Sequence, residues 1–473
     1  MSIFISTSIP YVNGKPHIGF AFESVQTDIL ARLLRQAGKE VYFTTGTDEN
    51  ALKNVESSEK AGIPIQQFVD SNANEFLRLC KALDISNDTF IRTTSKLHIT
   101  GSQKLWHLCC KDLYKKTYSG LYCVGCETFY EDGELPDNIC PHHNRKLELV
   151  EEENYFFALT KYQKQIEDLL VQDKLKIFPA YRKEELLNFV RKGLHDLSVS
   201  RPTERMKGWG VPVPGDDSQR MYVWYDALSN YITALGFGSA DLSLYDKYWA
   251  QSEARIHVVG KDIIKFHGIY WPAMLMSAGL PLPTHLFTHG FITVDGTKMS
   301  KSLGNVVDPF TIINNYGLDA TRYYLAREIP EHDDGDYSDH RMRQLITSDL
   351  ANEFGNLLSR SLAIGAKDGL VIESTQDEDK STITLDDSFS YQEILTSIWA
   401  SVKEINRSFN EYAPWNRDTS SRADFMTKNI QHLNKLGYML RPFLPAVAEI
   451  VIRNTSGTIE KISPIFPRLT EAK

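Results

Sequence analysis

A strand, a glycine-containing turn and an amphipathic helix follow one another at the start of the chain, and this order constrains the fold more than any other feature. Ile3-Phe4-Ile5 reads as a buried strand, and residues 17–36 carry apolar side chains at helical spacing. Gly38 follows as expected at a helix end. The next strand, at residues 41–45, leads into the acidic segment 46–50, and open α/β sheets bind ligands at the carboxyl ends of their strands. We therefore expect an α/β nucleotide-binding fold with a Rossmann-like, doubly wound parallel sheet.

A basic pentapeptide, Lys298-Met299-Ser300-Lys301-Ser302, follows a strand-like run at residues 291–294 and an Asp295-Gly296 turn. We expect the pentapeptide to begin a mobile surface loop. Two lysine ammonium groups on flexible stems can close over a polyphosphate. Two lysines alone are more often a solvated basic loop. A second candidate phosphate-binding motif, Pro16-His17-Ile18-Gly19, lies near the start of the chain and favours the interpretation that the pentapeptide binds phosphate.

Cysteine spacing predicts a structural metal site in the segment after residue 117. Cys123-x-x-Cys126 is followed, after thirteen intervening residues, by Cys140-Pro141-His142-His143. Three cysteines and one histidine at this separation are typical of a tetrahedral, closed Zn²⁺ site. His143 is favoured over His142 because it repeats the spacing of the first pair. The alternative is a surface loop with free thiols, and neither interpretation gives these residues a catalytic role.

The α/β pattern then resumes and brings several aromatic residues near strand ends. Residues 221–228 enter a helix that carries Tyr231, and the strand at 256–259 ends in Gly260-Lys261-Asp262. A helix from about Ile263 places His267 and Trp271 four residues apart, on one face. Any one of these aromatic residues could be a core residue, but with Trp224 they make a shared aromatic pocket plausible. From about residue 340 the pattern changes to amphipathic helices, at residues 349–363, 391–409 and 429–442, with a polar, acidic loop at 373–388.

Composition limits the function classes. A chain of 473 residues is expected to hold about three domains. Its net charge of −9 argues weakly against a nucleic-acid partner, so such binding would need local contacts. The sequence has no run of 18 apolar residues and no signal peptide, so we expect no membrane association. Cysteine usage fits a reducing compartment, and we expect a cytoplasmic protein. Since the sequence ends within the helical part, we expect a monomer.

Taken together, the motifs resemble those of the class I aminoacyl-tRNA synthetases, specifically the zinc-containing bacterial methionyl-tRNA synthetases, over nearly all of the chain. The resemblance rests on their order and spacing: Pro16-His17-Ile18-Gly19, Gly46-Thr47-Asp48-Glu49, the zinc knuckle, Val223-Trp224-Tyr225-Asp226-Ala227-Leu228, Gly260-Lys261-Asp262 and the unaltered Lys-Met-Ser-Lys-Ser. It implies a methionine–tRNA ligase that forms methionyl-adenylate from L-methionine and ATP. The methionyl group then passes to the terminal adenosine of initiator and elongator methionine tRNA.

The resemblance also implies roles for individual residues. His17, Lys298 and Lys301 would be catalytic, and Gly19, Gly260 and Asp262 would join them in binding ATP with Mg²⁺. Asp48 would pair with the methionine ammonium group, and Arg201 matches an active-site position of less certain role. The methionine pocket maps onto Ile9, Tyr11, Asp48, Trp224, Ala227, Leu228, Tyr231, Ile263, His267 and Trp271. Anticodon-reading positions map onto Asn356, Arg360 and Trp415, and the metal site onto Cys123, Cys126, Cys140 and His143.

On this basis the chain divides into five segments. These are a first catalytic half at 1–116, a connective insertion at 117–220 with a zinc knuckle at about 120–146, a second catalytic half at 221–292, a lysine-loop and stem-contact region at 293–345, and an α-helical anticodon-binding domain at 346–473.

The sequence departs from the family pattern at two places. Phe20 replaces the second histidine of the first motif, and phenylalanine cannot donate a hydrogen bond to phosphate. One lost donor costs about 10²-fold in rate, so we expect reduced but real adenylation. Asn50-Ala51 replaces a usual His-Gly pair. One alternative is a tRNA-binding paralogue with impaired activation, which Phe20 suggests. Another is a small-molecule adenylating enzyme of the same superfamily, against which the helical domain argues.

Overall fold

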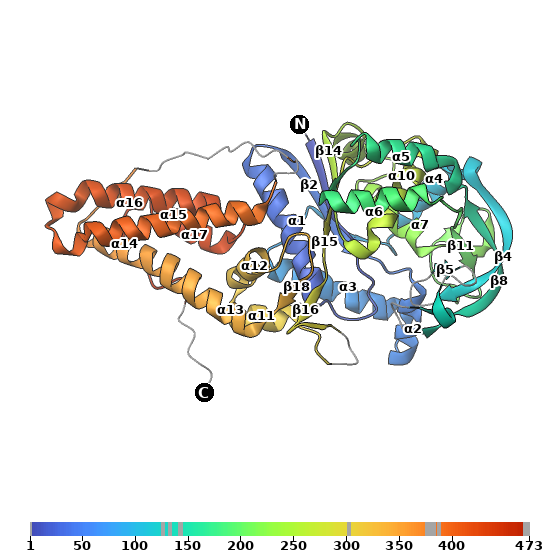
Figure 1. Ribbon diagram of the computed structural model, residues 1–473, viewed down its shortest axis with the longest axis horizontal. Coiled ribbons are helices and arrows are strands. Elements are labelled where there is room, and N and C mark those ends of the chain that lie inside the picture. Colours follow the sequence, from blue (N-terminus) through green and yellow to red (C-terminus); the bar gives the residue numbers. More distant parts are fainter. Residues whose placement is uncertain are drawn as a thin grey trace. The chain divides into compact units, whose positions relative to one another are not determined.

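The computed structural model describes residues 2–123, 128–130, 135–140, 145–299, 304–373, 385 and 389–466 (Figure 1). By its internal contacts the chain separates into two compact units. Unit 1 consists of Met1–Pro16, Glu40–Arg78 and Asn87–Thr288, and unit 2 of His17–Lys39, Leu79–Ser86 and His289–Lys473. Neither this division nor the rest of the structure tests the five predicted segments, which stay a prediction.

A six-stranded sheet organises unit 1 within the described residues. Its order is β3 (Thr89–Arg92), β2 (Glu40–Thr47), β1 (Ser2–Thr7), β14 (Ala254–Gly260), β15 (His285–His289), β9 (Lys176–Phe178). The pairs β3–β2, β2–β1, β1–β14 and β15–β9 are all parallel. Successive strands add on one side of β1 and the chain later returns to its other side, which makes the gap between β1 and β14 a topological switch point. The predicted doubly wound parallel sheet is confirmed.

The segment between β3 and β14 forms antiparallel sheets. One sheet has the order β10 (Leu197–Ser198), β8 (Glu148–Phe157), β4 (Leu113–Cys123), β5 (Thr128–Tyr130). Another has the order β11 (Ser200–Pro202), β13 (Asp216–Met221), β12 (Pro212–Val213), and β6 (Ile139–Cys140) pairs with β7 (Arg145–Lys146). Strand β9, at residues 176–178, does not join these antiparallel sheets but pairs with β15 in the six-stranded sheet.

Helices complete unit 1. The α-helices are α2 (Leu52–Ala61), α3 (Ile65–Ala82, whose last turn belongs to unit 2), α4 (Lys96–Leu108), α5 (Gln163–Val171), α6 (Ala180–Arg191), α7 (Val223–Leu228), α8 (Asn230–Thr233), α9 (Ser243–Tyr245) and α10 (Trp271–Ala278). The 3₁₀ turns are η1 (Cys110–Asp112), η2 (Pro136–Asn138), η3 (Leu159–Tyr162) and η5 (Lys261–Ile263). Two wider turns, of the π type, are η4 (Asp246–Ala250) and η6 (Phe266–Tyr270).

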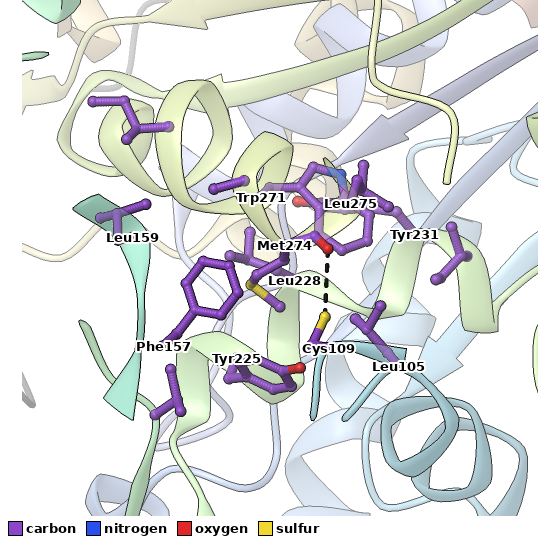
Figure 2. Close-up of a cluster of buried hydrophobic side chains, with 14 of the residues drawn as sticks. Leu105, Cys109, Phe157, Leu159, Tyr225, Leu228, Tyr231, Trp271, Met274 and Leu275 are labelled. Carbon is purple, nitrogen blue, oxygen red and sulfur yellow. Dashed lines mark hydrogen bonds between the residues drawn. The ribbon is translucent and has the colours of Figure 1, made fainter. Parts of the chain in front are cut away.

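A large apolar core joins α4, α7 and α10 in unit 1. Figure 2 shows part of it, where Tyr225 and Leu228 of α7 lie near Trp271 and Met274 of α10. The Cys109 thiol donates a 3.4 Å hydrogen bond to the Met274 carbonyl (Figure 2). Burial of this kind contributes roughly 25 cal/mol per Å² of apolar surface, so the helices behind the switch point are fixed by packing.

Unit 2 is mostly helical. Its α-helices are α1 (Ile18–Gln36), α11 (Pro309–Tyr316), α12 (Leu318–Arg327), α13 (Asp339–Leu345), α14 (Asn356–Lys367), α15 (Tyr391–Tyr412), α16 (Thr419–Leu440) and α17 (Pro445–Asn454), with η7 (Ile346–Gly355) and η8 (Pro414–Asn416). Strands β16 (Ile292–Val294), β17 (Thr297–Lys298) and β18 (Gly335–Tyr337) form one small sheet, and β19 (Val371–Ile372) pairs with β20 (Gly457–Thr458). Helices α14, α15 and α16 lie side by side in the bundle (Figure 1).

The long helices follow from their sequence patterns. His17 caps α1, because its Nδ1 accepts a hydrogen bond from the Gly19 N–H, and Ser390 caps α15 in the same way through the Glu393 N–H. Helix α16 begins ten residues before the predicted 429, with Asp418 as its capping residue. Among the described residues, no helix combines the length and apolar character that crossing a membrane requires.

Candidate active site

A small hollow opens at the switch point of unit 1, where the ends of β1 and β14 meet α7 and α8. It is lined by Ser8, Ile9, Trp224, Ala227, Leu228, Asn230, Tyr231 and His267. Its empty volume, including space open to solvent, is about 220 Å³. Six of the lining residues belong to the predicted methionine pocket.

A chain of hydrogen bonds fixes the protonation of the polar end of this hollow. His267 Nδ1 lies 2.9 Å from the Ile263 carbonyl oxygen, which can only accept, so Nδ1 carries the proton. In the neutral ring His267 Nε2 is then an acceptor, and the Tyr231 hydroxyl, 2.6 Å away, donates to it. The hollow therefore presents a hydrogen-bonded phenol–imidazole pair beside apolar side chains.

Aromatic packing sets the shape of the hollow. The Trp224 ring stacks on Phe266 with centroids 3.8 Å apart and an interplanar angle of 13°, and His267 lies edge-on to Trp224. The predicted single helix from Ile263 is instead a 3₁₀ turn, the wide turn η6 and then α10. Wide turns of this type are frequent at functional sites, and this one carries His267. Trp271 is fully buried behind Tyr231 and does not line the hollow.

Tyr11 and Asp48 are paired just beyond the ends of β1 and β2. They form a parallel bridge, and the Asp48 N–H donates to the Pro10 carbonyl at 2.9 Å. Asp48 is 2% exposed, while neither residue is among those that line the hollow. The neighbouring Glu49 is fully buried and accepts two hydrogen bonds from Arg92, which holds the end of β2 in place.

His17 and Gly19 lie at the start of α1 in unit 2. Since His17 Nδ1 accepts from the Gly19 N–H at 3.0 Å, the neutral ring carries its proton on Nε2, the atom that can donate to a phosphate oxygen. A Cβ at position 19 would meet the His17 ring at 2.8 Å, so glycine makes room for this arrangement. Phe20, at the place of the second signature histidine, is 7% exposed.

The lysine pentapeptide begins in a hairpin of unit 2. Thr293 pairs with Lys298 and Val294 with Thr297, and both turn residues have positive φ, 47° at Asp295 and 75° at Gly296. This turn confirms the prediction from Asp-Gly. Lys298 ends strand β17, which corrects the expectation that the loop starts there, because the turn brings the residue back alongside β16. Lys301 lies outside the described residues.

The remaining predicted ATP residues, Gly260 and Asp262, lie in unit 1 at the end of β14 and in η5. They belong to the same strand end that leads to His267. Arg201 is buried on β11 and donates to the Ser198 hydroxyl at 2.9 Å, with its guanidinium 4.5 Å from the centre of the Tyr222 ring. It is not a lining residue of the hollow.

Two of the four predicted metal ligands are described. Cys123 ends β4 and Cys140 ends β6, and both are buried with Leu121 and Leu147 in one small cluster. Cys126 and His143, like His142, lie outside the described residues, and within the described part of the chain no group of three or more acidic, cysteine and histidine side chains is placed to hold a metal ion.

The predicted anticodon residues gather at one place in unit 2. The Arg360 guanidinium lies 4.9 Å from the centre of the Trp415 ring and 4.9 Å from that of Phe409, and it donates to Asn410. Trp415 is 47% exposed, so it is not a core residue. Asn356 is exposed one helical turn before Arg360 on α14.

Sequence reasoning missed two lining residues of the hollow, Ser8 and Asn230. Each is the chain neighbour of a predicted residue, Ile9 or Tyr231. It also missed His98, which contacts Asp226 and Thr233. Nothing in the sequence around His98 marks it, since these two partners lie more than 100 residues away.

Comparison with known proteins identifies the family. The model described as tRNA synthetases class I (M) matches residues 3–149 and 134–362. The methionine–tRNA ligase of Brucella melitensis is 40% identical over 512 residues, covering 99% of this chain and 98% of the relative. That of Thermotoga maritima is 39% identical over 481 residues, covering 96% of this chain and 75% of the relative.

Solved structures agree with these relatives. Mycobacterium tuberculosis methionyl-tRNA synthetase in complex with methionyl-adenylate matches with a TM-score of 0.88 and 34% identity, covering 99% of this chain and 100% of that one. Its apo form matches with a TM-score of 0.82 and 31% identity, covering 100% and 99%. The chain therefore belongs to the methionyl-tRNA synthetases, a family of the class I tRNA synthetases.

Proposed function

We propose that this chain is a methionine–tRNA ligase, which activates L-methionine with ATP to methionyl-adenylate and transfers it to the 3′ adenosine of methionine tRNA. The observation that carries the proposal is the hollow at the switch point, with its hydrogen-bonded Tyr231–His267 pair. The names of the relatives give the same activity. They do not support the alternative of a tRNA-binding paralogue that has lost activation.

The residues that line the hollow suit the methionine side chain in polarity. A thioether is polarizable and attracted to aromatic rings, which Trp224 and Tyr231 supply. The His267 ring adds a polar contact. Two buried carboxylates, Asp48 and Glu49, stand at the end of β2. Because Arg92 already holds Glu49, we assign Asp48 to the substrate ammonium group. Ile9, Tyr11, Ala227, Leu228, Ile263 and Trp271 complete the assigned methionine pocket.

Adenylation requires positioning and charge neutralisation more than covalent chemistry by the protein. We assign His17 Nε2–H as a donor to ATP phosphate, with Gly19 beneath it. Lys298 and Lys301 would neutralise the departing pyrophosphate, and Mg²⁺ bound with ATP would supply further positive charge. Gly260 and Asp262, at the end of β14, would contact the nucleoside. Arg201 is assigned to the active site without a defined step.

The exposed Arg360–Trp415 contact supports a role in reading the anticodon. Single-stranded RNA loops are recognised by stacking of bases on aromatic rings and by donors to base edges. Trp415 provides an exposed ring, and Arg360 and Asn356 provide donors on the adjacent helix face. We assign these three residues to the anticodon of methionine tRNA.

We further propose a structural Zn²⁺ ion held by Cys123, Cys126, Cys140 and His143. The support is the burial of Cys123 and Cys140 at the ends of two short hairpins with few other apolar residues around them. Metal binding contributes on the order of 10 kcal/mol to the folding of such a segment. Elemental analysis of the purified protein should find about one zinc per chain in the wild type, and Cys140→Ser should lose it. Equal zinc content in both proteins would contradict the assignment.

Exchange of labelled pyrophosphate into ATP tests the activity directly. We expect exchange that depends on L-methionine, with leucine and isoleucine as the control amino acids. Charging of methionine tRNA by the same preparation then tests the second step. A folded protein that shows no methionine-dependent exchange would contradict the proposed function.

A further inference from the structure

A fully buried carboxyl group lies on α7, next in sequence to a residue that lines the hollow, and two side chains from other parts of unit 1 contact it. Asp226, on α7, is 0% exposed. Its Oδ2 accepts a hydrogen bond of 2.6 Å from the Asn50 amide, and its Oδ1 lies 2.5 Å from His98 Nε2. His98 is itself fully buried, and its Nδ1 lies 2.8 Å from the Thr233 hydroxyl. A buried carboxylate needs donors to offset its lost hydration, and Asn50 supplies one of them.

These contacts join the two sides of the assigned methionine site. Asn50 lies two residues after Asp48, at the end of β2, and its own N–H lies 3.4 Å from Asp48 Oδ1. Asp226 lies on the short helix α7, between Trp224 and Ala227, which both line the hollow. The Asn50–Asp226 hydrogen bond therefore links the segment that carries the ammonium-binding carboxylate to the helix that carries the side-chain wall.

We propose that Asn50 is a positioning residue for methionine, acting through Asp226 to set the spacing between Asp48 and the wall formed by α7. This inference rests on the proposed function. Its effect should appear in methionine recognition more than in ATP recognition. A shift of α7 changes the fit of the amino acid, whereas ATP contacts are assigned to other elements. Substrate positioning errors of about 1 Å can cost 10²-fold in rate.

The geometry also shows how Asn50 and Ala51 suit their positions in this chain. The Asn50 amide uses both of its N–H groups, one for Asp226 and one for the Thr93 carbonyl at 3.1 Å. Ala51 has φ −69° and ψ 142°, an ordinary extended conformation, so glycine is not required there. A histidine at position 50 would keep a ring N–H for Asp226 but has no second donor for Thr93 in its neutral form.

Methionine and ATP dependences of pyrophosphate exchange, measured separately, test this role. We expect Asn50→Ala to raise the KM for methionine about tenfold and Asn50→Asp to raise it further, because a second carboxylate would face Asp226. Asn50→His should stay within about threefold of the wild type. The KM for ATP should change less than about twofold in all three. Asn154→Ala, which alters a buried asparagine on β8, is the matched control and should leave both constants unchanged.

The outcomes separate the inference from the function on which it rests. A folded Asn50→Ala enzyme whose KM for methionine stays within twofold of the wild type would overturn the inference, as would an equal rise in both KM values. Should Asn50→Ala fail to fold, Asn50→Ser, whose hydroxyl keeps one donor, is judged by the same two criteria. Absence of exchange by the wild-type protein would instead overturn the proposed function.

Discussion

At the scale of single residues, His17 and Gly19 show how one glycine can make room for the orientation of a neighbouring ring. A Cβ at position 19 would lie 2.8 Å from the His17 ring, so Gly19→Ala must turn the ring away and break the hydrogen bond to Nδ1. We expect the exchange rate to fall about 10²-fold, the effect of losing one donor to the transition state. The thermal midpoint should change little, because the substitution lies in the first turn of a 19-residue helix. A rate within threefold of the wild type would contradict the role of the ring.

Phe20 is the second residue whose effect can be measured alone. Its side chain is 7% exposed and cannot donate to phosphate. Phe20→His restores the usual motif, and we expect it to raise the exchange rate, by at most about 10²-fold. The assay compares kcat for exchange in the two proteins at saturating methionine and ATP. If the rate is unchanged, position 20 does not limit catalysis in this chain.

The sequence identified the candidate site residues that stand in recognisable motifs, and it missed those that stand outside such motifs. His17, Trp224 and Tyr231 stand in recognisable motifs. Asn230 and His98 matter because of neighbours far along the chain, which no local pattern encodes. Phe266 stacks on Trp224 only because a wide turn brings it there.

At the scale of elements, the sequence predicted the existence of helices and strands better than their ends. The spacing of apolar residues identified α1, α15 and the main strands, because burial of one face of an element makes apolar residues recur at a regular interval in the sequence. The start of α16 was misplaced because its first ten residues are mostly polar and show no apolar period. The 3₁₀ turn and the wide turn η6 that precede α10 were predicted as part of one regular helix. The spacing of apolar residues does not distinguish a wide helical turn from an α-helical turn.

The N-terminus of α15 provides a prediction for an element. The Glu331 carboxylate accepts hydrogen bonds from the Ser390 hydroxyl at 2.8 Å and from the Gln392 N–H. Burial nevertheless raises the pKa of Glu331 to about 7, with the nearby Glu393 adding to the rise and the hydrogen bonds to Ser390 and Gln392 opposing it. His332 Nε2 lies 3.8 Å from the other oxygen. A raised carboxyl pKa means that folding favours the protonated form, so its stabilisation is present below pH 4.5 and is lost as the pH rises through 7.

Glu331→Gln should therefore stabilise the protein only at higher pH. Glutamine resembles the neutral acid, so the two proteins should have similar free energies of unfolding at pH 4.5. Between pH 4.5 and pH 7, the free energy of unfolding of the variant should rise relative to that of the wild type by at most about 1.4 kcal/mol per pH unit. Urea unfolding at pH 5 and pH 8 measures this difference. Glu328→Gln, which alters an exposed ion pair with Arg341, is the control. A difference that is the same at both pH values would contradict the raised pKa.

At the scale of the whole molecule, the order of strands determines where chemistry can occur. The parallel pairing of β1 with β2 and β14 brings residues 8–11, 48–50 and 260–267 to the same sheet edge, although the first and last of these segments are about 250 residues apart. The strand pattern was enough to predict this edge in unit 1. The side-chain arrangement within it was not predictable, because it depends on packing with α7 and α10.

A single buried arginine holds several segments of unit 2 together. Arg322, on α12, is fully buried and pairs with Asp28 of α1 at 2.7 Å. It also donates to the carbonyl groups of Leu83, Pro442 and Phe443, and α1 packs against α12 (Figure 1). Burial opposes ionisation of Asp28, but Arg322, Arg32 and Ser86 together keep its pKa below the ordinary value. Asp28 and Arg322 thus form a buried ion pair with nearly complete hydrogen bonding.

Substitution of Arg322 should lower the free energy of unfolding far more than substitution of an exposed arginine. Arg322→Met leaves the Asp28 charge buried, and breaking a buried pair costs about 3–5 kcal/mol. Asp28→Asn in the same chain should recover part of this loss, so the two substitutions should be less than additive in urea unfolding. Arg407→Met, which removes an exposed pair with Glu404, should change the free energy of unfolding by less than about 1 kcal/mol. Equal effects at positions 322 and 407 would contradict the importance of the buried pair.

The assignment of activation to unit 1 and the start of α1, and of anticodon reading to the helical bundle, predicts that the two steps can be separated. Trp415→Ala removes an exposed ring that Arg360 contacts, and loss of base stacking on one aromatic residue costs about 1–3 kcal/mol. We expect charging of methionine tRNA to fall roughly 5- to 150-fold, while methionine-dependent pyrophosphate exchange stays within twofold. Tyr438→Ala, which removes a similar ring beside Arg441 on α16, should leave both steps unchanged. If Trp415→Ala lowers exchange and charging equally, the ring supports the fold of unit 2 and does not read the anticodon.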